Sequence, residues 1–79
     1  MTTTWLRLTP VFRQIFDDEE LTIGAATTAD DVEGWDSLAN IRLMIAIEQE
    51  FRIRFSAVEI SKLKNVGELA ALIERKAAG

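Results

Sequence analysis

Residues 37–52 most constrain the fold, because apolar side chains recur through this stretch at helical spacing on two opposite sides. At about 100° per residue, one side of such a helix carries Leu43, Met44, Ile47 and Phe51. The other side carries Leu38, Ile41 and Ile45. A helix in a small bundle buries one face well, and we expect the side that ends in Phe51 to be buried. The second side is then an interaction surface or the mouth of a ligand pocket.

A first helix is predicted over roughly residues 4–17. Its apolar positions at helical spacing are Leu8, Val11, Phe12, Ile15 and Phe16. Pro10 lies inside this stretch, where it either kinks a helix that begins near Thr4 or starts a shorter helix capped by Thr9. Because the apolar face extends back to Trp5, we favour the longer helix.

Two shorter helices are predicted after residue 55, each introduced by a capping signature. Ser56 and Glu59 have the spacing of a capping box, which predicts a helix that ends at about residues 61–63. Asn65 and Glu68 repeat the pattern ahead of a final helix that ends near Lys76. The buried face of this last helix is expected to comprise Val66, Leu69, Leu72 and Ile73.

The connection between the first two helices, residues 18–36, shows no sustained periodicity. A loop of this length in a compact domain is usually functional or disordered. Thr28 and Asp31 are placed to cap one short turn within it. Leu21, Ile23 and Val32 are expected to pack against the core and hold this loop in place. Ile53 and Phe55 are expected to do the same for the connection that follows the long helix. No segment alternates convincingly as a strand. We therefore predict one domain over residues 1–79, an all-α four-helix bundle with a long first loop and a short third helix.

The chain contains neither cysteine nor histidine, and this restricts its chemistry. Disulfides, thiolate nucleophiles, imidazole bases and cysteine or histidine metal ligands are all excluded. The acidic residues that follow Asp17 do not have the spacing of a calcium loop, so we expect no metal site. A carboxylate enzyme using Asp30, Asp31 or Asp36 remains an alternative, but the sequence offers no paired orienting group. We expect no catalysis by the chain, and any thiol chemistry requires an added cofactor.

The charges are divided unevenly along the chain. Eight acidic residues and no basic residue lie from Asp17 to Asp36, whereas seven Lys/Arg and five Glu follow Ser37. Nucleic acid is an unsuitable partner, since it requires a concentrated basic face. The acidic stretch is suited to attract basic surfaces of partner enzymes, or it serves only to keep a small protein in solution. The longest apolar run, residues 43–47, is too short to cross a bilayer, and no signal peptide is recognisable. We expect a cytoplasmic monomer without membrane insertion.

The pentapeptide Gly34-Trp35-Asp36-Ser37-Leu38 places a serine between a turn and the apolar helix. Glycine favours the turn, and Asp36 is a strong N-cap residue. Ser37 is then the first helical residue, beside free backbone N–H groups and the positive end of the helix dipole. This environment suits a phosphate ester.

The pentapeptide, followed by the apolar stretch from Ile41 to Phe51, resembles the attachment motif of acyl carrier proteins, and the similarity covers most of the chain. The resemblance implies an acyl-carrier-like bundle in which Ser37 is esterified by 4′-phosphopantetheine. A separate phosphopantetheinyl transferase donates this group from coenzyme A. Asp36 belongs to the same motif. The cofactor thiol would hold acyl groups as thioesters for acyl-transferring and acyl-modifying enzymes.

The second apolar side of the long helix is the candidate partner-binding surface. Leu38 and Ile45 match positions that such carriers use to touch partner enzymes, and Ile41, Arg42 and Glu48 complete the candidate set.

The helix also departs from the pattern of carriers in fatty-acid synthesis. Ala39, Arg42 and Gln49 stand where acidic residues are frequent, and Arg42 would repel a basic docking surface. We therefore expect a carrier in a specialised lipid or polyketide pathway. A peptidyl or aminoacyl carrier is the first alternative, and an unmodified helical interaction module is the second.

Overall fold

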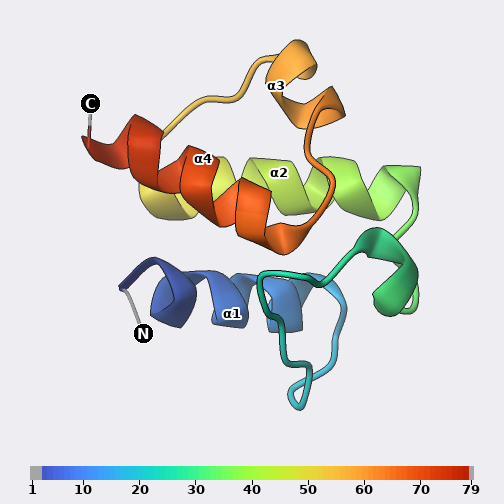
Figure 1. Cartoon of the computed structure of the whole chain (residues 1–79). Coiled ribbons are helices and arrows are strands. Elements are labelled where there is room, and N and C mark those ends of the chain that lie inside the picture. The colour runs from blue at the N-terminus through green and yellow to red at the C-terminus, as the bar shows by residue number, and fades with distance from the viewer. Residues whose placement is uncertain (1–2, 79) are drawn as a thin grey trace.

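Four α-helices make up the computed structural model, which describes residues 3–78: α1 (Thr3–Ile15), α2 (Ser37–Phe51), α3 (Ala57–Ser61) and α4 (Val66–Ala78). One 3-10 turn, η1 (Ala29–Asp31), interrupts the long loop between α1 and α2. Figure 1 shows α1 packed along α2 and α4. Helix α3 lies on the opposite side of α2 and α4 from α1. No strand occurs within residues 3–78. The predicted all-α fold with a long first loop and a short third helix is confirmed.

The first helix is the longer of the two alternatives, because Pro10 lies inside α1. The Thr9 hydroxyl donates a hydrogen bond to the Trp5 carbonyl (2.9 Å), so Thr9 is an interior residue of the helix and not its cap. Pro10 is exposed, which leaves its ring in solvent.

The helix ends two residues before the approximate end predicted at Asp17. Asp17 adopts a left-handed conformation with φ of 51°, which a continuing α-helix does not permit. The Asp18 N–H donates to the Arg13 carbonyl (3.0 Å), and the Asp17 N–H donates to Gln14 (3.4 Å). These two hydrogen bonds form a Schellman end, so α1 stops at Ile15.

The other helix boundaries agree with the sequence to within two residues. Arg52, with φ of 56°, caps the end of α2. The Ser56 hydroxyl accepts from the Glu59 N–H (3.1 Å), and the Glu59 carboxylate accepts from the Ser56 N–H (2.9 Å), which confirms the capping box of α3. α4 continues to Ala78, beyond the predicted Lys76, since alanine is the strongest helix former.

At the start of α4, the Asn65 side chain accepts from the Glu68 N–H (2.8 Å), as its capping role predicts. The Glu68 carboxylate bonds the Lys64 N–H (2.9 Å) instead of the N–H of the cap residue. In η1, the Asp31 carboxylate accepts from the Thr28 N–H (2.9 Å), so the predicted short turn is present.

The core lies where α1, α2 and α4 meet. Its buried residues from these helices are Leu8, Val11, Phe12, Leu43, Met44, Ile47, Phe51, Val66, Leu69, Ala70 and Ile73. This confirms which side of α2 is buried. Of the connecting residues, Val32 and Ile53 are buried. The side chains of Leu21, Ile23 and Phe55 are partly buried and pack against the core. No helix in the described chain combines the length and apolarity needed to cross a membrane.

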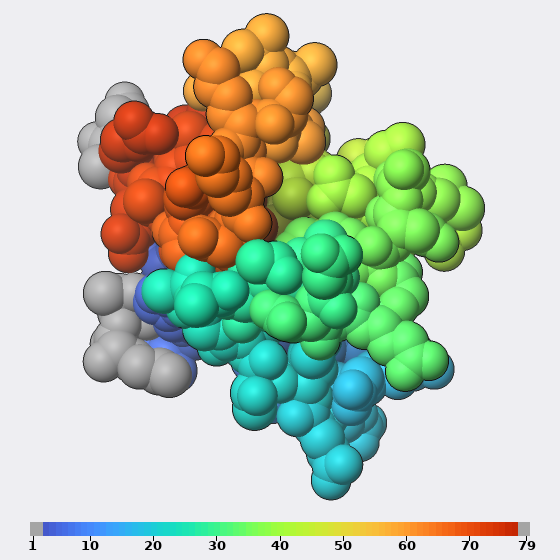
Figure 2. Space-filling view, turned by 45° about the vertical axis from the view of Figure 1, so that its right-hand side comes forward, coloured from blue at the N-terminus to red at the C-terminus, as the bar shows by residue number. Residues whose placement is uncertain are grey.

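The long loop is joined to α4 by two backbone hydrogen bonds. The Val66 N–H donates to the Thr27 carbonyl (2.8 Å), and the Gly67 N–H donates to Ala25 (3.0 Å). These bonds use N–H groups in the first turn of α4, which have no acceptor within the helix. In Figure 2 the loop (teal) lies against the start of α4 (orange).

Gly67→Ala is expected to destabilise the fold by about 1–3 kcal/mol, the range of overpacked sites, although alanine favours a helix. A Cβ at Gly67 would lie 2.7 Å from the Ala25 carbonyl oxygen, so the loop must move away from α4. Urea denaturation measures the change. Gly24→Ala is the matched control, because a Cβ there meets nothing closer than 3.9 Å. Equal midpoint shifts in both variants would contradict the close approach.

Candidate functional site

Ser37 is the first residue of α2, and its side chain is exposed. Asp36 precedes it in an extended conformation and accepts a hydrogen bond from the Ala39 N–H through Oδ1 (2.8 Å). The predicted N-cap is therefore present. Gly34 supplies the turn with φ of 86°, which L-residues rarely adopt.

Trp35 anchors this turn to the core. Its indole N–H donates to the Asn40 side-chain oxygen (2.9 Å), which links the turn to the second turn of α2. Its ring packs edge-on against Phe12, with 5.4 Å between centroids, and lies 5.7 Å from Phe16. The position of Ser37 is therefore fixed relative to α1 as well as α2. The sequence analysis did not single out Asn40. The available signal was an asparagine five residues after Trp35, near the side of the helix that carries Leu43 and Met44.

A cavity of about 400 Å³ opens beside Ser37. Its walls come from the loop, α2, α3, the segment after α3 and α4: Ala29, Trp35, Asp36, Ser37, Asn40, Met44, Ile60, Leu63, Lys64, Asn65 and Leu69. Apolar and polar side chains both line the cavity. Such a combination suits a ligand with a polar head and an apolar body.

A phosphate ester fits the residues around Ser37. The N–H groups of Ser37 and Leu38 lie in the first helical turn, where no intrahelical acceptor exists. The helix dipole adds positive potential at the same place. Lys64 is a basic residue among those that line the cavity.

The second apolar side of α2 is exposed, as predicted. Leu38, Ile41 and Ile45 expose 58%, 57% and 49% of their surface, and Arg42 is exposed beside them. We call Leu38, Ile41, Arg42 and Ile45 the α2 stripe. Large apolar side chains left in solvent along one helix face are typical of an interaction site.

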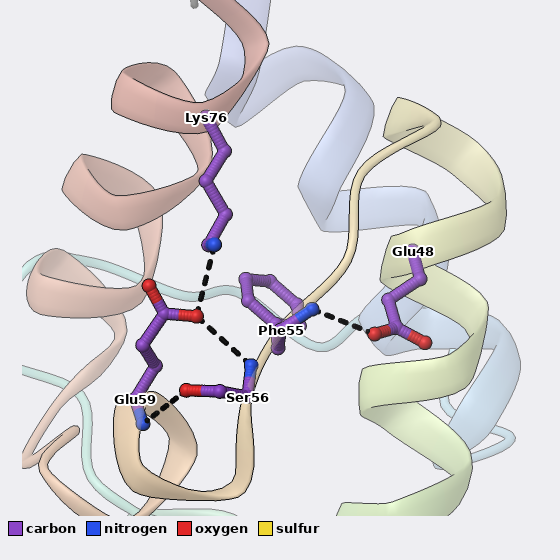
Figure 3. Close-up of polar contacts among 5 residues, drawn as sticks. All are labelled: Glu48, Phe55, Ser56, Glu59 and Lys76. Carbon is purple, nitrogen blue, oxygen red and sulfur yellow. Dashed lines mark hydrogen bonds and ion pairs between the residues drawn. The ribbon is translucent and has the colours of Figure 1, made fainter.

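Glu48, the remaining candidate for partner binding, makes an internal contact. Its Oε2 accepts a hydrogen bond from the Phe55 N–H (2.8 Å; Figure 3), and the side chain is partly buried. The structure therefore gives Glu48 a role in holding the α2–α3 connection. Across residues 3–78, no group of three or more acidic side chains is arranged to hold a metal ion.

Comparison with known proteins gives concordant results. The family described as "Phosphopantetheine attachment site" matches residues 7–73. An acyl carrier protein of Thermosynechococcus vestitus is 34% identical over 65 residues, which are 82% of this chain and 79% of that protein. The solution structure of a holo acyl carrier protein from Geobacter metallireducens superimposes with a TM-score of 0.91. It is 43% identical, over 98% of this chain and 88% of that one.

The chain belongs to the acyl carrier protein family, whose members bear a phosphopantetheine attachment site. Its cofactor is covalently attached 4′-phosphopantetheine. Its partners include transferases and acyl-handling enzymes.

Proposed function

We propose that Ser37 is the attachment residue and that the chain carries acyl groups on the arm held there. The observation that carries the proposal is the exposed Ser37 side chain at the N-terminus of α2, beside a cavity with apolar and polar walls, in a chain of this family. Asp36 supports it by holding the first turn in place.

Attachment requires a phosphoryl transfer at the Ser37 hydroxyl. Ser37 Oγ forms a bond to the phosphorus next to pantetheine, the pyrophosphate bond of coenzyme A breaks, and the nucleotide half leaves. The hydroxyl proton passes to a base of the transferase. The free N–H groups of the first turn then stabilise the negative phosphodiester. The arm supplies the thiol that forms thioesters.

The cargo is proposed to be an acyl group of a specialised lipid or polyketide pathway. Exposed Arg42 in the α2 stripe supports this, since a generic basic docking surface would meet a positive charge there. Intact-protein mass from the native host tests the proposal, because it reports arm and cargo together. An amino acid on the arm would instead identify an aminoacyl carrier, and a mass without the arm would contradict attachment.

The α2 stripe is proposed to dock partner enzymes beside the arm, with Arg42 tuning which are accepted. Ile45→Ala is expected to lower kcat/KM for holo-protein formation by roughly fivefold, because a central apolar contact is lost. Arg42→Glu is expected to raise it with a basic-surfaced transferase, and the gain should shrink as salt rises.

Leu6→Ala is the matched control, since Leu6 is 63% exposed but lies on α1. The measurement is kcat/KM for each variant at two ionic strengths. Unchanged efficiency in Ile45→Ala together with no gain in Arg42→Glu would refute docking through the stripe and leave Ser37 as the proposed attachment residue.

A further inference from the structure

Two asparagine side chains line the cavity beside Ser37, and the oxygen of each is already engaged within the chain. Asn40 Oδ1 accepts the Trp35 indole N–H (2.9 Å), and Asn65 Oδ1 accepts the Glu68 backbone N–H (2.8 Å). The indole nitrogen and the backbone nitrogen only donate, so each asparagine must turn its oxygen toward them. The described part of the chain supplies no acceptor for either Nδ2. Both side chains therefore keep N–H donors for an occupant of the cavity.

The contacts around the two asparagines hold these donors in place. The Asn40 backbone N–H donates to the Asp36 carbonyl (2.9 Å), while Trp35, which holds the side-chain oxygen, packs against Phe12. Asn65 is held by its capping bond at the start of α4. Both asparagines are partly buried. Donors that are already oriented lose little conformational freedom on binding, and partial burial strengthens the hydrogen bonds that they form.

The position of the donors indicates which chemical group they fit. Asn40 follows Ser37 by three residues, which is about 4.5 Å along the helix axis. A phosphate ester on Ser37 lies at the free backbone N–H groups of the first turn, so the asparagines meet a group beyond it. A neutral amide donor suits a neutral carbonyl oxygen. Apolar cavity walls suit the hydrocarbon next to such a carbonyl, and they are formed by Met44, Ile60, Leu63 and Leu69.

We infer that Asn40 and Asn65 form a subsite that binds a carbonyl oxygen inside the cavity, and we call this pair the carbonyl subsite. The carbonyl has two possible sources, an amide of the pantetheine arm and a keto group of an oxidised acyl chain. The inference rests on the proposed attachment of an acyl-bearing arm at Ser37 and adds the kind of group that the cavity recognises.

Nuclear magnetic resonance of side-chain NH2 groups tests the subsite directly. Asn40 and Asn65 are the only asparagines of the sequence, and its only glutamines are Gln14 and Gln49. The two glutamines are exposed and do not line the cavity, so they serve as internal references. Spectra are compared for apo-protein, holo-protein, holo-protein with a saturated acyl chain, and holo-protein with a 3-oxoacyl chain of equal length. Intact mass verifies each form.

Both asparagine NH2 signals are expected to shift together, while the glutamine signals stay in place. A shift that appears in the holo-protein identifies an amide of the arm as the bound carbonyl. A shift that appears only with the 3-oxoacyl chain identifies the keto group of the cargo. Signals of Asn40 and Asn65 that stay at their apo positions in all forms would overturn the inference.

Aspartate substitutions remove the donors and keep the internal hydrogen bonds. Asn65→Asp retains a strong N-cap for α4, and Asn40→Asp retains an acceptor for the Trp35 indole N–H, whose own signal reports that this bond persists. In each variant, the shift of the remaining asparagine is expected to fall by about half or more, because the shared carbonyl loses one donor.

Gln49→Glu is the matched control for the added charge, since Gln49 is exposed on α2 and does not line the cavity. Both asparagine shifts should keep their wild-type size in this variant. An equal reduction in Gln49→Glu would show that charge alone causes the effect, and it would overturn the subsite. So would a full-sized shift of the remaining asparagine in both aspartate variants.

The same measurements separate the subsite from the proposed function. A protein that gains the arm but shows no asparagine shift refutes the subsite and leaves the attachment at Ser37 standing. A protein that never gains the arm refutes the proposed function. The subsite is then decided by adding pantetheine in millimolar excess to the apo-protein. Shifts at Asn40 and Asn65 alone would support it, and unchanged signals would overturn it.

Discussion

Ser37→Ala is expected to abolish the gain of 4′-phosphopantetheine, because no other hydroxyl lies at the first turn of α2 beside the cavity. The helix should persist, since its N-cap is Asp36 and the Asp36–Ala39 hydrogen bond does not involve the Ser37 side chain. Intact mass after incubation with a transferase and coenzyme A measures the modification, and far-UV circular dichroism measures the fold.

Ser61→Ala is the matched control for this experiment. Ser61 is the last residue of α3 and not at a helix N-terminus, and its hydroxyl donates to the Val58 carbonyl, so wild-type modification is expected. An alanine variant at residue 37 that still gains the mass of the arm would show that the attachment residue is elsewhere. A wild-type protein that never gains it would point to the unmodified interaction module.

Phe51→Ala is expected to destabilise the protein by about 3–5 kcal/mol, the cost of deleting a buried aromatic side chain. Phe51 is 8% exposed at the end of α2, and the Arg7 guanidinium lies 4.4 Å from the centre of its ring. Arg7 Nε also pairs with Glu50 Oε2 at 3.0 Å, which holds the cation in place. The substitution therefore removes core burial and a cation–π contact between α1 and α2.

Ile45→Ala is the comparison within the same helix. Ile45 is 49% exposed, so its truncation should cost about 1 kcal/mol, clearly less than the loss at Phe51. Urea denaturation with equal m-values gives both free energies of unfolding. Similar midpoint shifts would mean that the two sides of α2 do not differ in their contribution to the core.

The helices and the two sides of α2 were predictable because they depend on local sequence. Periodicity places Leu43 and Phe51 on one face, and capping residues such as Asp36 and Ser56 mark helix starts. The end of α1 was not predictable in this way, since it depends on a left-handed conformation at Asp17, a residue type that favours this conformation only weakly.

The contacts that shape the candidate site were less accessible to sequence reasoning. The Trp35–Asn40 hydrogen bond, the Glu48–Phe55 contact and the Glu59–Lys76 pair join residues whose spacing has no periodic signature. They arise only when the bundle brings separate segments together. The motif at Ser37 thus indicated the chemistry, whereas the cavity walls required the fold.

The hydrogen bonds from the long loop to α4 join two segments that lie far apart in the sequence. Ala25 and Thr27 are synthesised well before their partners Gly67 and Val66, so the loop has no α4 to bind while the earlier helices emerge. The contacts that hold residues 25 and 27 against α4 therefore form only after residues 66 and 67 have been synthesised.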